Sequence, residues 1–375
     1  MESREEVLEE LNLTTALVGE NLRGMNFSNS DLSNCSFVNV DFALTSLKGA
    51  DLTSCQFVQC DFRGSDLTAA IGVSSAWVNC NFEDAIFLDL DLRGAQISGA
   101  TITNPRLAGS MLSTSIFHNG SLLNLEVTGK LERFVASEIN FEGLRAPGIE
   151  LERCIFHKCS FSEANMVEAV LREATFVDSD IKSARIEGIE IYKALFQEMD
   201  LTGRNFSGVK FFGAQFIECE MAKIDFSGAT LEKCGFMKAN LEEADFSRST
   251  TLQSNFAEAK LAQANLSGAD LQQTIWKEAD LINADFKGCN LEGSFFEGAD
   301  LKKTDFGDSK LVYVDFSKAD LSDAKVVNCD LYMAKLDGIT EEGTDWSRSK
   351  KRRAQKPDKD KMEAEEWPTA TQRNN

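Results

Sequence analysis

The stretch ANLSGADLQQTIWKEADLINADF, residues 264–286, is built from a unit of five residues. Most copies read small residue, Asp or Asn, Leu or Phe, and two variable positions. With few exceptions every fifth residue from Leu17 to Leu336 is apolar. A fixed internal period is the signature of a repeat architecture, in which each unit packs against its neighbours. The sequence therefore predicts a solenoid.

A period of five fits neither a straight helix nor a flat strand. On an α-helix the step spreads apolar residues around the whole surface, and on a strand it reverses every second unit. Within one unit the strand rule works: with Leu or Phe at position i, residues i−2 and i point inward and i−1 outward. The chain must then turn at i+1 and i+2, which are rich in Ser, Gly, Lys and Glu. Four quarter turns close a coil of 20 residues.

Units such as Ala239-Asn240-Leu241, Ala284-Asp285-Phe286 and Ala319-Asp320-Leu321 resemble the pentapeptide-repeat family, and the resemblance covers about residues 15–340. It implies the family's fold, an all-β solenoid that forms a right-handed quadrilateral β-helix. The length of the repeat region predicts about sixteen coils. The handedness comes from the family and not from the spacing.

Aromatic residues recur every 20 residues, which predicts a stacked column in the core. The column comprises Phe156, Phe176, Phe196, Phe216, Phe236, Phe256, Trp276, Phe296 and Phe316. A second column has Phe206, Phe226, Phe246, Phe286 and Phe306. We interpret these residues as structural core and predict no cofactor-binding residues and no cofactor.

All ten cysteines fall at position i−2, where Ala, Ser and Thr stand in other units. They are expected to act as small buried apolar residues with free thiols. Cys35/Cys55 and Cys60/Cys80 are 20 apart, within disulfide reach on neighbouring coils, but nothing indicates an oxidising compartment. No close CxxC pair exists, so no metal site is predicted.

The chain divides into five segments by pattern. Residues 1–14 predict a capping helix, in which Ser3 and Glu6 form a capping box over the open end of the β-helix. Residues 15–127 form the first repeat block, 128–150 a register slip or loop, and 151–346 the second block. Residues 347–375 are predicted to be a disordered charged tail. Pro105 stands at i−2, and the sequence leaves its cis or trans state open.

The sequence offers little for catalysis. Its two histidines, His118 and His157, both fall at i+1 and would share a face two coils, or about 10 Å, apart, too far for one metal ion. No phosphate-binding loop, nucleophile elbow or HExxH motif occurs. We predict no catalytic residues and no enzymatic activity.

Charge separates the repeat region from the C-terminal segment. Residues 1–340 hold 52 acidic and 30 basic residues, a net charge of −22, whereas residues 341–375 have a net charge of +1. An acidic repeat region is not expected to bind nucleic acid directly. The sequence has no signal peptide and no long apolar run, so it predicts no membrane span and a cytoplasmic protein, with signal-less export left open.

One face of the predicted solenoid is acidic and has small turn residues. Its candidate partner-binding residues are Asp225, Asp245, Asp285, Asp305 and Asp308, interrupted by Arg248 and Lys287. Such a stripe could imitate the phosphates of DNA, as some pentapeptide-repeat proteins that act on DNA gyrase do. The alternative is that Asp and Asn at i−1 simply suit the repeat.

Outward aromatic residues form a second candidate surface. Tyr192 and Phe212 both fall at i+1, 20 apart, and are candidate partner-binding residues. An equally plausible alternative is an aromatic side chain that covers its own turn. The run from Lys350 to Arg353 is either a solvated tail or a segment that binds an acidic surface or acts as a targeting signal.

These patterns favour a non-enzymatic, rigid scaffold that presents flat β-helix faces to a protein partner. The alternative is an acidic DNA mimic that binds a type II topoisomerase, and a third hypothesis is an exported effector. Fold alone does not decide among them. The partner's identity and the oligomeric state stay open at this level.

Overall fold

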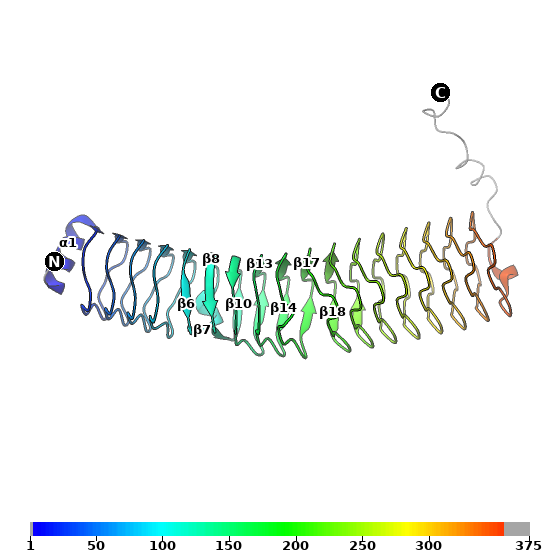
Figure 1. Ribbon diagram of the computed structural model, residues 1–375, viewed down its shortest axis with the longest axis horizontal. Helices are drawn as coiled ribbons and strands as arrows, with labels where there is room; N and C mark the ends of the chain where they lie inside the picture. Colours follow the sequence, from blue (N-terminus) through cyan, green and yellow to red (C-terminus); the bar gives the residue numbers. More distant parts are fainter. Residues whose placement is uncertain (1–2, 356–375) are drawn as a thin grey trace, which may run out of the picture. The chain divides into compact units, whose positions relative to one another are not determined.

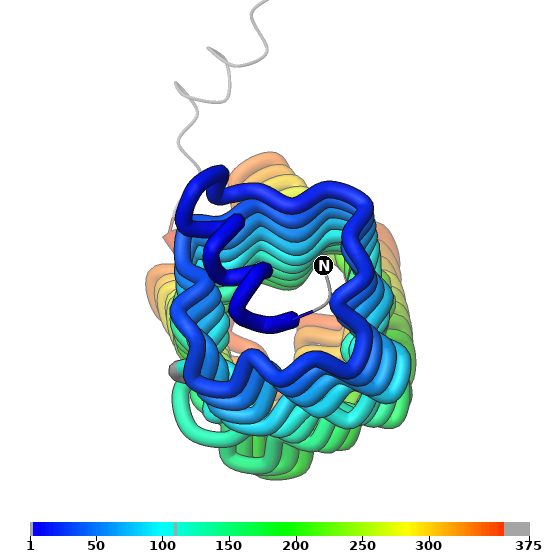
Figure 2. Tube along the Cα trace, turned by 90° about the vertical axis from the view of Figure 1, so that its left-hand side faces the viewer, coloured from blue at the N-terminus to red at the C-terminus, as the bar shows by residue number. Residues whose placement is uncertain are grey.

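The computed structural model describes residues 3–355, and it is an all-β solenoid with one short N-terminal helix (Figure 1). The chain divides into two compact units, residues 1–200 and 201–375, which are described separately. The end-on view shows four-sided turns in unit 1 (Figure 2). The predicted fold class is confirmed.

Helix α1 (Arg4–Thr14) covers the open end of the first turn, as predicted (Figure 2). Ser3 caps the helix, because its side chain accepts a hydrogen bond from the Glu6 N–H at 3.3 Å. Val7 and Leu11 are buried, and the Arg4 guanidinium donates to the Ser30 hydroxyl at 2.9 Å. These contacts bury the helix's apolar side against the first turns.

Unit 1 contains three parallel sheets. The longest has the order β1-β2-β3-β4-β5-β8-β11-β13-β15-β17, with β6 paired to β8. Its strands are β1 (Ala16–Val18), β2 (Ser36–Val38), β3 (Gln56–Val58), β4 (Ala76–Val78), β5 (Gln96–Ser98), β6 (Thr101–Thr103), β8 (Ile116–Leu123), β11 (Val135–Asn140), β13 (Ile155–His157), β15 (Thr175–Val177) and β17 (Leu195–Gln197).

The second sheet comprises β10 (Lys130–Glu132), β12 (Glu150–Glu152), β14 (Val170–Arg172) and β16 (Glu190–Tyr192). The third pairs β7 (Arg106–Ala108) with β9 (Glu126–Thr128), and the short 3-10 helix η1 spans Gly109–Leu112. Partner residues are 20 apart at most pairings, for example Phe37 with Phe57. The predicted length of one coil is therefore observed directly in the ladder.

Unit 2 has fewer regular strands. These are β18 (Lys210–Phe212), β19 (Gln215–Ile217) and β20 (Thr230–Glu232), and the 3-10 helix η2 spans Lys351–Arg353. Beyond β20 the turns pair through isolated parallel bridges that are again 20 residues apart, such as Asp245 with Asn265. The ladder register thus continues where strands do not.

Regular strands mark fewer turns than the prediction of about sixteen coils, while the bridges continue at the same spacing beyond them. Regular strands mark about eleven turns. The physical reason is the residue at i−1. Where it is Asp or Asn, its side chain accepts the N–H of the residue two positions on, as Asp245 accepts from Ser247 at 2.8 Å, and the chain turns at once. Every strand from β1 to β20 begins at an i−1 residue other than Asp or Asn, although other residues at this position, such as Ile71 and Ile275, also form single bridges.

One turn of unit 1 is a residue short. Strands β5 and β8 pair Gln96 with Ile116, 20 apart, but β8 and β11 pair Ile116 with Val135, 19 apart. The segment 128–150, interpreted from sequence as a slip or loop, contains β10 and β11 and continues the ladder. The register change is thus taken up inside the solenoid. No peptide bond in residues 3–355 is cis, so Pro105 is trans.

The aromatic column is stacked and buried in both units. In unit 1 the ring centroids of Phe156 and Phe176 are 4.8 Å apart and those of Phe176 and Phe196 are 5.6 Å apart. In unit 2 the stack runs through Phe216, Phe236, Phe256, Trp276, Phe296 and Phe316, with centroid separations of 4.1 to 5.7 Å. Every one of these rings is at most 4% exposed.

Two tryptophans are buried in this interior, and each donates a hydrogen bond to a neighbouring hydroxyl. The Trp77 indole N–H donates to Ser75 Oγ at 2.6 Å, and the Trp276 indole N–H donates to Thr274 Oγ1 at 2.7 Å. In both cases the acceptor is the i−2 residue of the same unit. The pairing matters because a buried indole N–H without an acceptor is costly.

Candidate functional site

In the long sheet of unit 1, the two outward residues that flank the first core residue of each strand include no Asp, Glu, Lys or Arg. We call the outer surface that they form the neutral sheet and define it by these two residues in each of ten strands. These residues are Ala16, Val18, Ser36, Val38, Gln56, Val58, Ala76, Val78, Gln96, Ser98, Ile116, His118, Val135, Ser137, Ile155, His157, Thr175, Val177, Leu195 and Gln197.

The neutral sheet exposes aliphatic side chains that the fold leaves uncovered. Val18 is 67% exposed, Ile116 44% and Ile155 42%. These residues lie on β1, β8 and β13, which belong to the same parallel sheet. Contiguous exposed aliphatic groups on a sheet indicate a contact surface. The sequence analysis missed it, although grouping the outward positions by the 20-residue register would have revealed it.

The second sheet of unit 1 has the opposite chemistry. We call its outer surface, on β10, β12, β14 and β16, the charged sheet. Lys130 pairs with Glu152 at 2.5 Å, and Arg172 pairs with Glu150 at 2.9 Å. The hydrogen bond from Lys130 lowers the pKa of Glu152. These exposed pairs contribute little to stability, but they keep the charged sheet well hydrated.

Tyr192 belongs to the charged sheet and has partners of its own. Its hydroxyl donates to Glu190 Oε2 at 2.8 Å, which raises the pKa of the tyrosine, and the Arg172 guanidinium lies 4.7 Å from the ring centroid. Phe212 lies in unit 2, where Lys233 Nζ is 5.4 Å from its ring. Each aromatic ring thus contacts a cation from a neighbouring turn.

The acidic stripe of unit 2 is aligned in the ladder. Isolated bridges join Asp225 to Asp245, Asp245 to Asn265, Asn265 to Asp285, and Asp285 to Asp305. Each of these side chains accepts the backbone N–H two residues on, at 2.8 to 3.1 Å. One oxygen of each side chain therefore accepts a hydrogen bond that stabilises the turn. The recurrence of Asp and Asn at i−1 could have indicated this role.

Two lysines reduce the charge at one end of the stripe. Lys287 Nζ lies 3.1 Å from Asp305, and Lys325 Nζ lies 3.6 Å from the same carboxylate. Burial opposes ionisation of Asp305, but the Gly307 N–H and Lys287 outweigh it and lower the pKa. Asp308 is exposed and accepts from Asn328 Nδ2 at 2.6 Å. Lys287 and Lys325 therefore reduce the negative charge at the Asp305 end of the stripe.

The two histidines lie in the same outward column of the neutral sheet. Ser137 pairs with His118 on one side and with His157 on the other, and its hydroxyl is 3.2 Å from His157 Nδ1. The histidines are thus two strands apart, as their spacing predicts. Across residues 3–355 no group of three or more His, Cys, Asp or Glu side chains is placed to hold a metal ion.

The cysteines are all buried and free. Burial raises the pKa of Cys55 and of Cys234 to about 12. A thiol with so high a pKa is not a nucleophile at neutral pH. The cysteines therefore fill the interior, as the sequence analysis expected.

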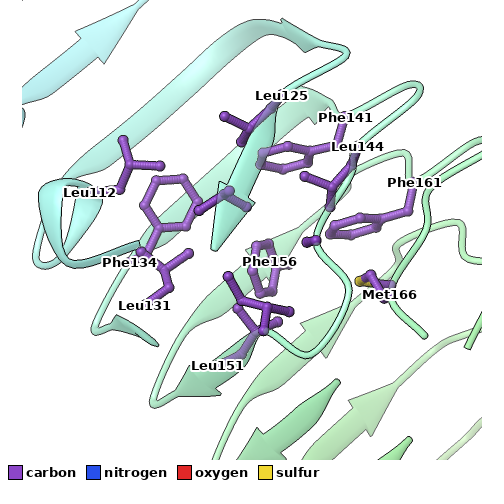
Figure 3. A pocket seen from close by; sticks show the side chains of 13 residues that line it. Leu112, Leu125, Leu131, Phe134, Phe141, Leu144, Leu151, Phe156, Phe161 and Met166 are labelled. Carbon is purple, nitrogen blue, oxygen red and sulfur yellow. The ribbon is translucent and has the colours of Figure 1, made fainter. Parts of the chain in front are cut away.

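A small cavity marks the turn that is one residue short (Figure 3). Its volume is about 20 Å³, and its lining is apolar and includes Phe134, Phe141 and Phe156. Ala146, at a position where most units have Leu or Phe, leaves part of this space. A void of this size has room for about one water molecule, so it is a packing defect and not a ligand site.

The basic run folds onto the last turn of unit 2. Lys351 forms an ion pair with Glu341 and lies 4.7 Å from the Trp346 ring, while Arg353 pairs with Asp330 at 3.0 Å. The backbone of Met333 donates to the Arg353 carbonyl at 2.9 Å. Residues 347–355, placed in the tail by the sequence analysis, thus extend the ladder. The rest of that predicted tail, 356–375, lies outside the described residues.

A family model described as pentapeptide repeats matches the chain eight times, at residues 15–47, 45–71, 74–104, 210–248, 239–275, 264–302, 279–312 and 299–338. A second, described as a pentapeptide repeat region, matches residues 149–226. Together they cover well over half of the sequence. The chain belongs to the pentapeptide-repeat family.

Solved structures of other pentapeptide-repeat proteins resemble this one. HetL, involved in heterocyst differentiation regulation in the cyanobacterium Nostoc sp. strain PCC 7120, is 24% identical over 57% of this chain and 90% of its own, with a TM-score of 0.43. Full-length QnrB1, a plasmid-mediated fluoroquinolone resistance protein, is 16% identical over 65% of this chain and 97% of its own, with a TM-score of 0.20.

A pentapeptide repeat protein from the Arabidopsis thaliana thylakoid lumen is 29% identical over 32% of this chain and 68% of its own, with a TM-score of 0.16. TM-scores this low carry no functional argument. The comparison with curated proteins gave no match. Within residues 3–355, no helix of this pentapeptide-repeat protein has the length and apolar character needed to cross a membrane.

Proposed function

We propose that this pentapeptide-repeat protein is a non-enzymatic, rigid scaffold that presents flat solenoid faces to a protein partner. The observation that carries the proposal is the ladder itself. Outward residues recur at a constant register of 20 residues, and the core residues between them are almost fully buried. A surface held in this way loses little conformational entropy when a partner binds.

Two observations support a non-enzymatic role. Burial raises the pKa values of the Cys55 and Cys234 thiols, and the aligned carboxylates of unit 2 accept hydrogen bonds from their own turns. Members of the pentapeptide-repeat family are generally structural or interaction proteins. We therefore expect the partner to be a macromolecule that binds an extended surface, and not a small-molecule substrate.

The test compares two surfaces in one capture experiment. In the stripe variant, Asp225, Asp245, Asp285 and Asp305 are changed to Asn, which removes charge but keeps the oxygen that each turn needs. In the aromatic variant, Tyr192 and Phe212 are changed to Ser. A matched control changes Asp280, Asp300 and Asp320 to Asn, in another aligned column of unit 2.

The scaffold proposal expects the wild-type protein to capture a defined protein from a lysate of its source cells. Loss of that protein with the stripe variant alone would assign the acidic stripe, and loss with the aromatic variant alone would assign Tyr192 and Phe212. Capture that is unchanged in every variant would reject both surfaces. A wild-type protein that captures nothing reproducibly would contradict the scaffold proposal.

The alternative function is an acidic DNA mimic that binds a type II topoisomerase. The observation in its favour is the alignment of Asp225 and Asp245 at neighbouring turns, about 4.8 Å apart along the ladder. Lys287 and Lys325 weaken it, because they neutralise the end of the stripe at Asp305. Titration of the purified protein into DNA gyrase, with and without a quinolone, tests it by supercoiling activity. Unchanged activity at equimolar or higher protein would reject the alternative.

A further inference from the structure

The neutral sheet differs in charge from the rest of the protein. Charged residues make up 26% of the sequence, so twenty positions would hold about five of them, yet these twenty hold none. The corner residues next to the first six strands are uncharged too. They are Gly19, Asn39, Gln59, Asn79, Gly99 and Asn119. The uncharged area is therefore widest on the N-terminal part of unit 1.

The neutral sheet has a regular relief on its first four strands, whereas on β8, β11, β13 and β17 the large aliphatic residue precedes the core position. On β1 to β4 the residue after the core position is Val18, Val38, Val58 or Val78, and the strand pairing puts these four in register. The residue before the core position is Ala16, Ser36, Gln56 or Ala76. A column of branched side chains thus runs beside a column that is mostly small. The surface has a ridge and, parallel to it, a shallower furrow.

We propose that two copies of this chain associate face to face through their neutral sheets. The two-fold axis lies in the interface and runs along the direction in which the strands stack. Rotation about that axis brings the valine column of one copy over the small-residue column of the other, so the surface is complementary to itself, as a two-fold interface requires. A two-fold axis along the strands would instead place β1 of one copy over β17 of the other, so that Val18 would face Gln197 and Val78 would face Ser137.

The available area suits a stable dimer. Ten strands about 4.8 Å apart cover about 48 Å, and the flat part of each side is about four residues, or 13 Å, wide. The product is roughly 600 Å² for each copy and 1,200 Å² in total. This value is at the lower end of the range of specific interfaces.

The charge of the protein favours a second copy of this chain as the partner that binds the neutral sheet. The protein has a net charge of −21, so an acidic or basic partner would interact with the charged surfaces and gain nothing from a neutral one. Two acidic copies can approach closely only where no like charges are buried together. The twenty positions of the neutral sheet meet that condition, although the corner residues beside its last four strands are charged, namely Glu138, Lys158, Asp178 and Glu198. Added salt screens the repulsion between the remaining charges, so it should strengthen this association.

The experiment measures the mass of the full-length protein by sedimentation equilibrium, over about 1 to 100 µM. We expect a transition from 41.4 kDa to twice that mass, shifted to lower concentration at higher salt. A variant with Val78→Lys and Ile116→Lys places charge in the neutral sheet at residues that are 36% and 44% exposed. It should weaken association on the order of 100-fold.

A matched control changes Ile71 and Ile86 to Lys, residues of unit 1 that are 41% and 43% exposed and lie outside the neutral sheet. This control should associate like the wild type, and circular dichroism should show all three proteins equally folded. A wild-type protein that is monomeric at every concentration and salt would overturn the proposal. So would a dimer that Val78→Lys and Ile116→Lys leave intact, since that dimer uses another surface.

A single exposed cysteine tests the orientation. In the proposed dimer the β1 strands of the two copies face each other, so Ala16→Cys should be cross-linked by a short bismaleimide. The native cysteines are all buried and do not compete. With the two-fold axis along the strands, the two introduced thiols would be about 43 Å apart and would not react with the same cross-linker. A dimer without cross-linking would overturn this arrangement.

Discussion

The neutral sheet of unit 1 and the acidic stripe of unit 2 have the same 20-residue register but differ in how the chain leaves each core residue. On the neutral sheet, residues such as Val58 and Val78 keep the backbone extended for three residues. On the stripe, Asp245 binds the Ser247 N–H and reduces the extended stretch to one bridge. The residue at i−1 thus selects both the local backbone and the chemistry of the face, while the interior stays the same.

The largest expected effect concerns that shared interior. Phe57 lies beneath the neutral sheet and Phe246 beneath the stripe, and both are at most 1% exposed. Changing either to Ala should lower the free energy of unfolding of its region by about 3–5 kcal/mol, because a cavity replaces a stacked ring. Native-state hydrogen exchange measures the two regions separately. A cost that differs between them by much more than about 1 kcal/mol would mean that the faces, and not only the core, carry stability.

The next largest effect is expected when the hydroxyl that accepts the hydrogen bond of each buried indole is removed. Ser75→Ala beneath the neutral sheet and Thr274→Val in unit 2 leave the N–H groups of Trp77 and Trp276 without acceptors, at a cost of about 1–3 kcal/mol each. Ser65→Ala is the matched control, because the buried Ser65 hydroxyl has no partner. Urea denaturation followed by tryptophan fluorescence provides the comparison. A control as costly as the two variants would reject the hydrogen-bond explanation.

A smaller effect separates turn geometry from charge. Asp245→Ala removes the acceptor of the Ser247 N–H and should cost about 0.5–1.5 kcal/mol, whereas Asp245→Asn should cost much less. Gln56→Ala, at the equivalent position of the neutral sheet, should have almost no effect. Thermal unfolding of the three variants tests this order. Equal losses for Ala and Asn at position 245 would show that the charge matters and the turn does not.

The smallest effect is a difference in acid sensitivity. The pKa of Asp305 is lowered in the folded state, so its contribution to stability is present above the unfolded value of about 4 and is lost as the pH falls through the lowered, folded-state pKa. The neutral sheet has no carboxylate, so its strands should lose less protection as the pH falls from about 7 to about 3. Hydrogen exchange at both pH values measures this, with Asp305→Asn as the variant. Acid sensitivity near Asp305 that this variant leaves unchanged would contradict the assignment.

Much of the fold was readable from the sequence because one physical constraint repeats. An apolar residue every five positions predicted the coil, and the ring spacing predicted the stacks from Phe156 to Phe196 and from Phe216 to Phe316. Ser3 and Glu6 predicted how α1 begins. Regular strands mark fewer turns than predicted, partly because Asp or Asn at i−1 shortens a strand to a bridge, an effect that leaves the period unchanged.

The surfaces were harder to predict, because outward residues have no period to obey. The acidic stripe attracted attention through its charge, although the oxygens of Asp225 and Asp245 also hold turns. The neutral sheet was missed because an absence of charge is visible only after twenty positions are sorted by face. The contacts of Lys351 and Arg353 depend on where the last turn ends, which the repeat does not specify.

The turn between Ile116 and Val135 shows that the ladder tolerates a missing residue, because pairing with the neighbours sets the register and a strict count does not. This has a consequence for how such surfaces can evolve. Gain or loss of 20 residues preserves every face, since each later residue returns to the same side. Gain or loss of a single five-residue unit moves every later residue to the next side. An uninterrupted surface such as the neutral sheet therefore indicates that the 20-residue phase was kept from β1 to β17.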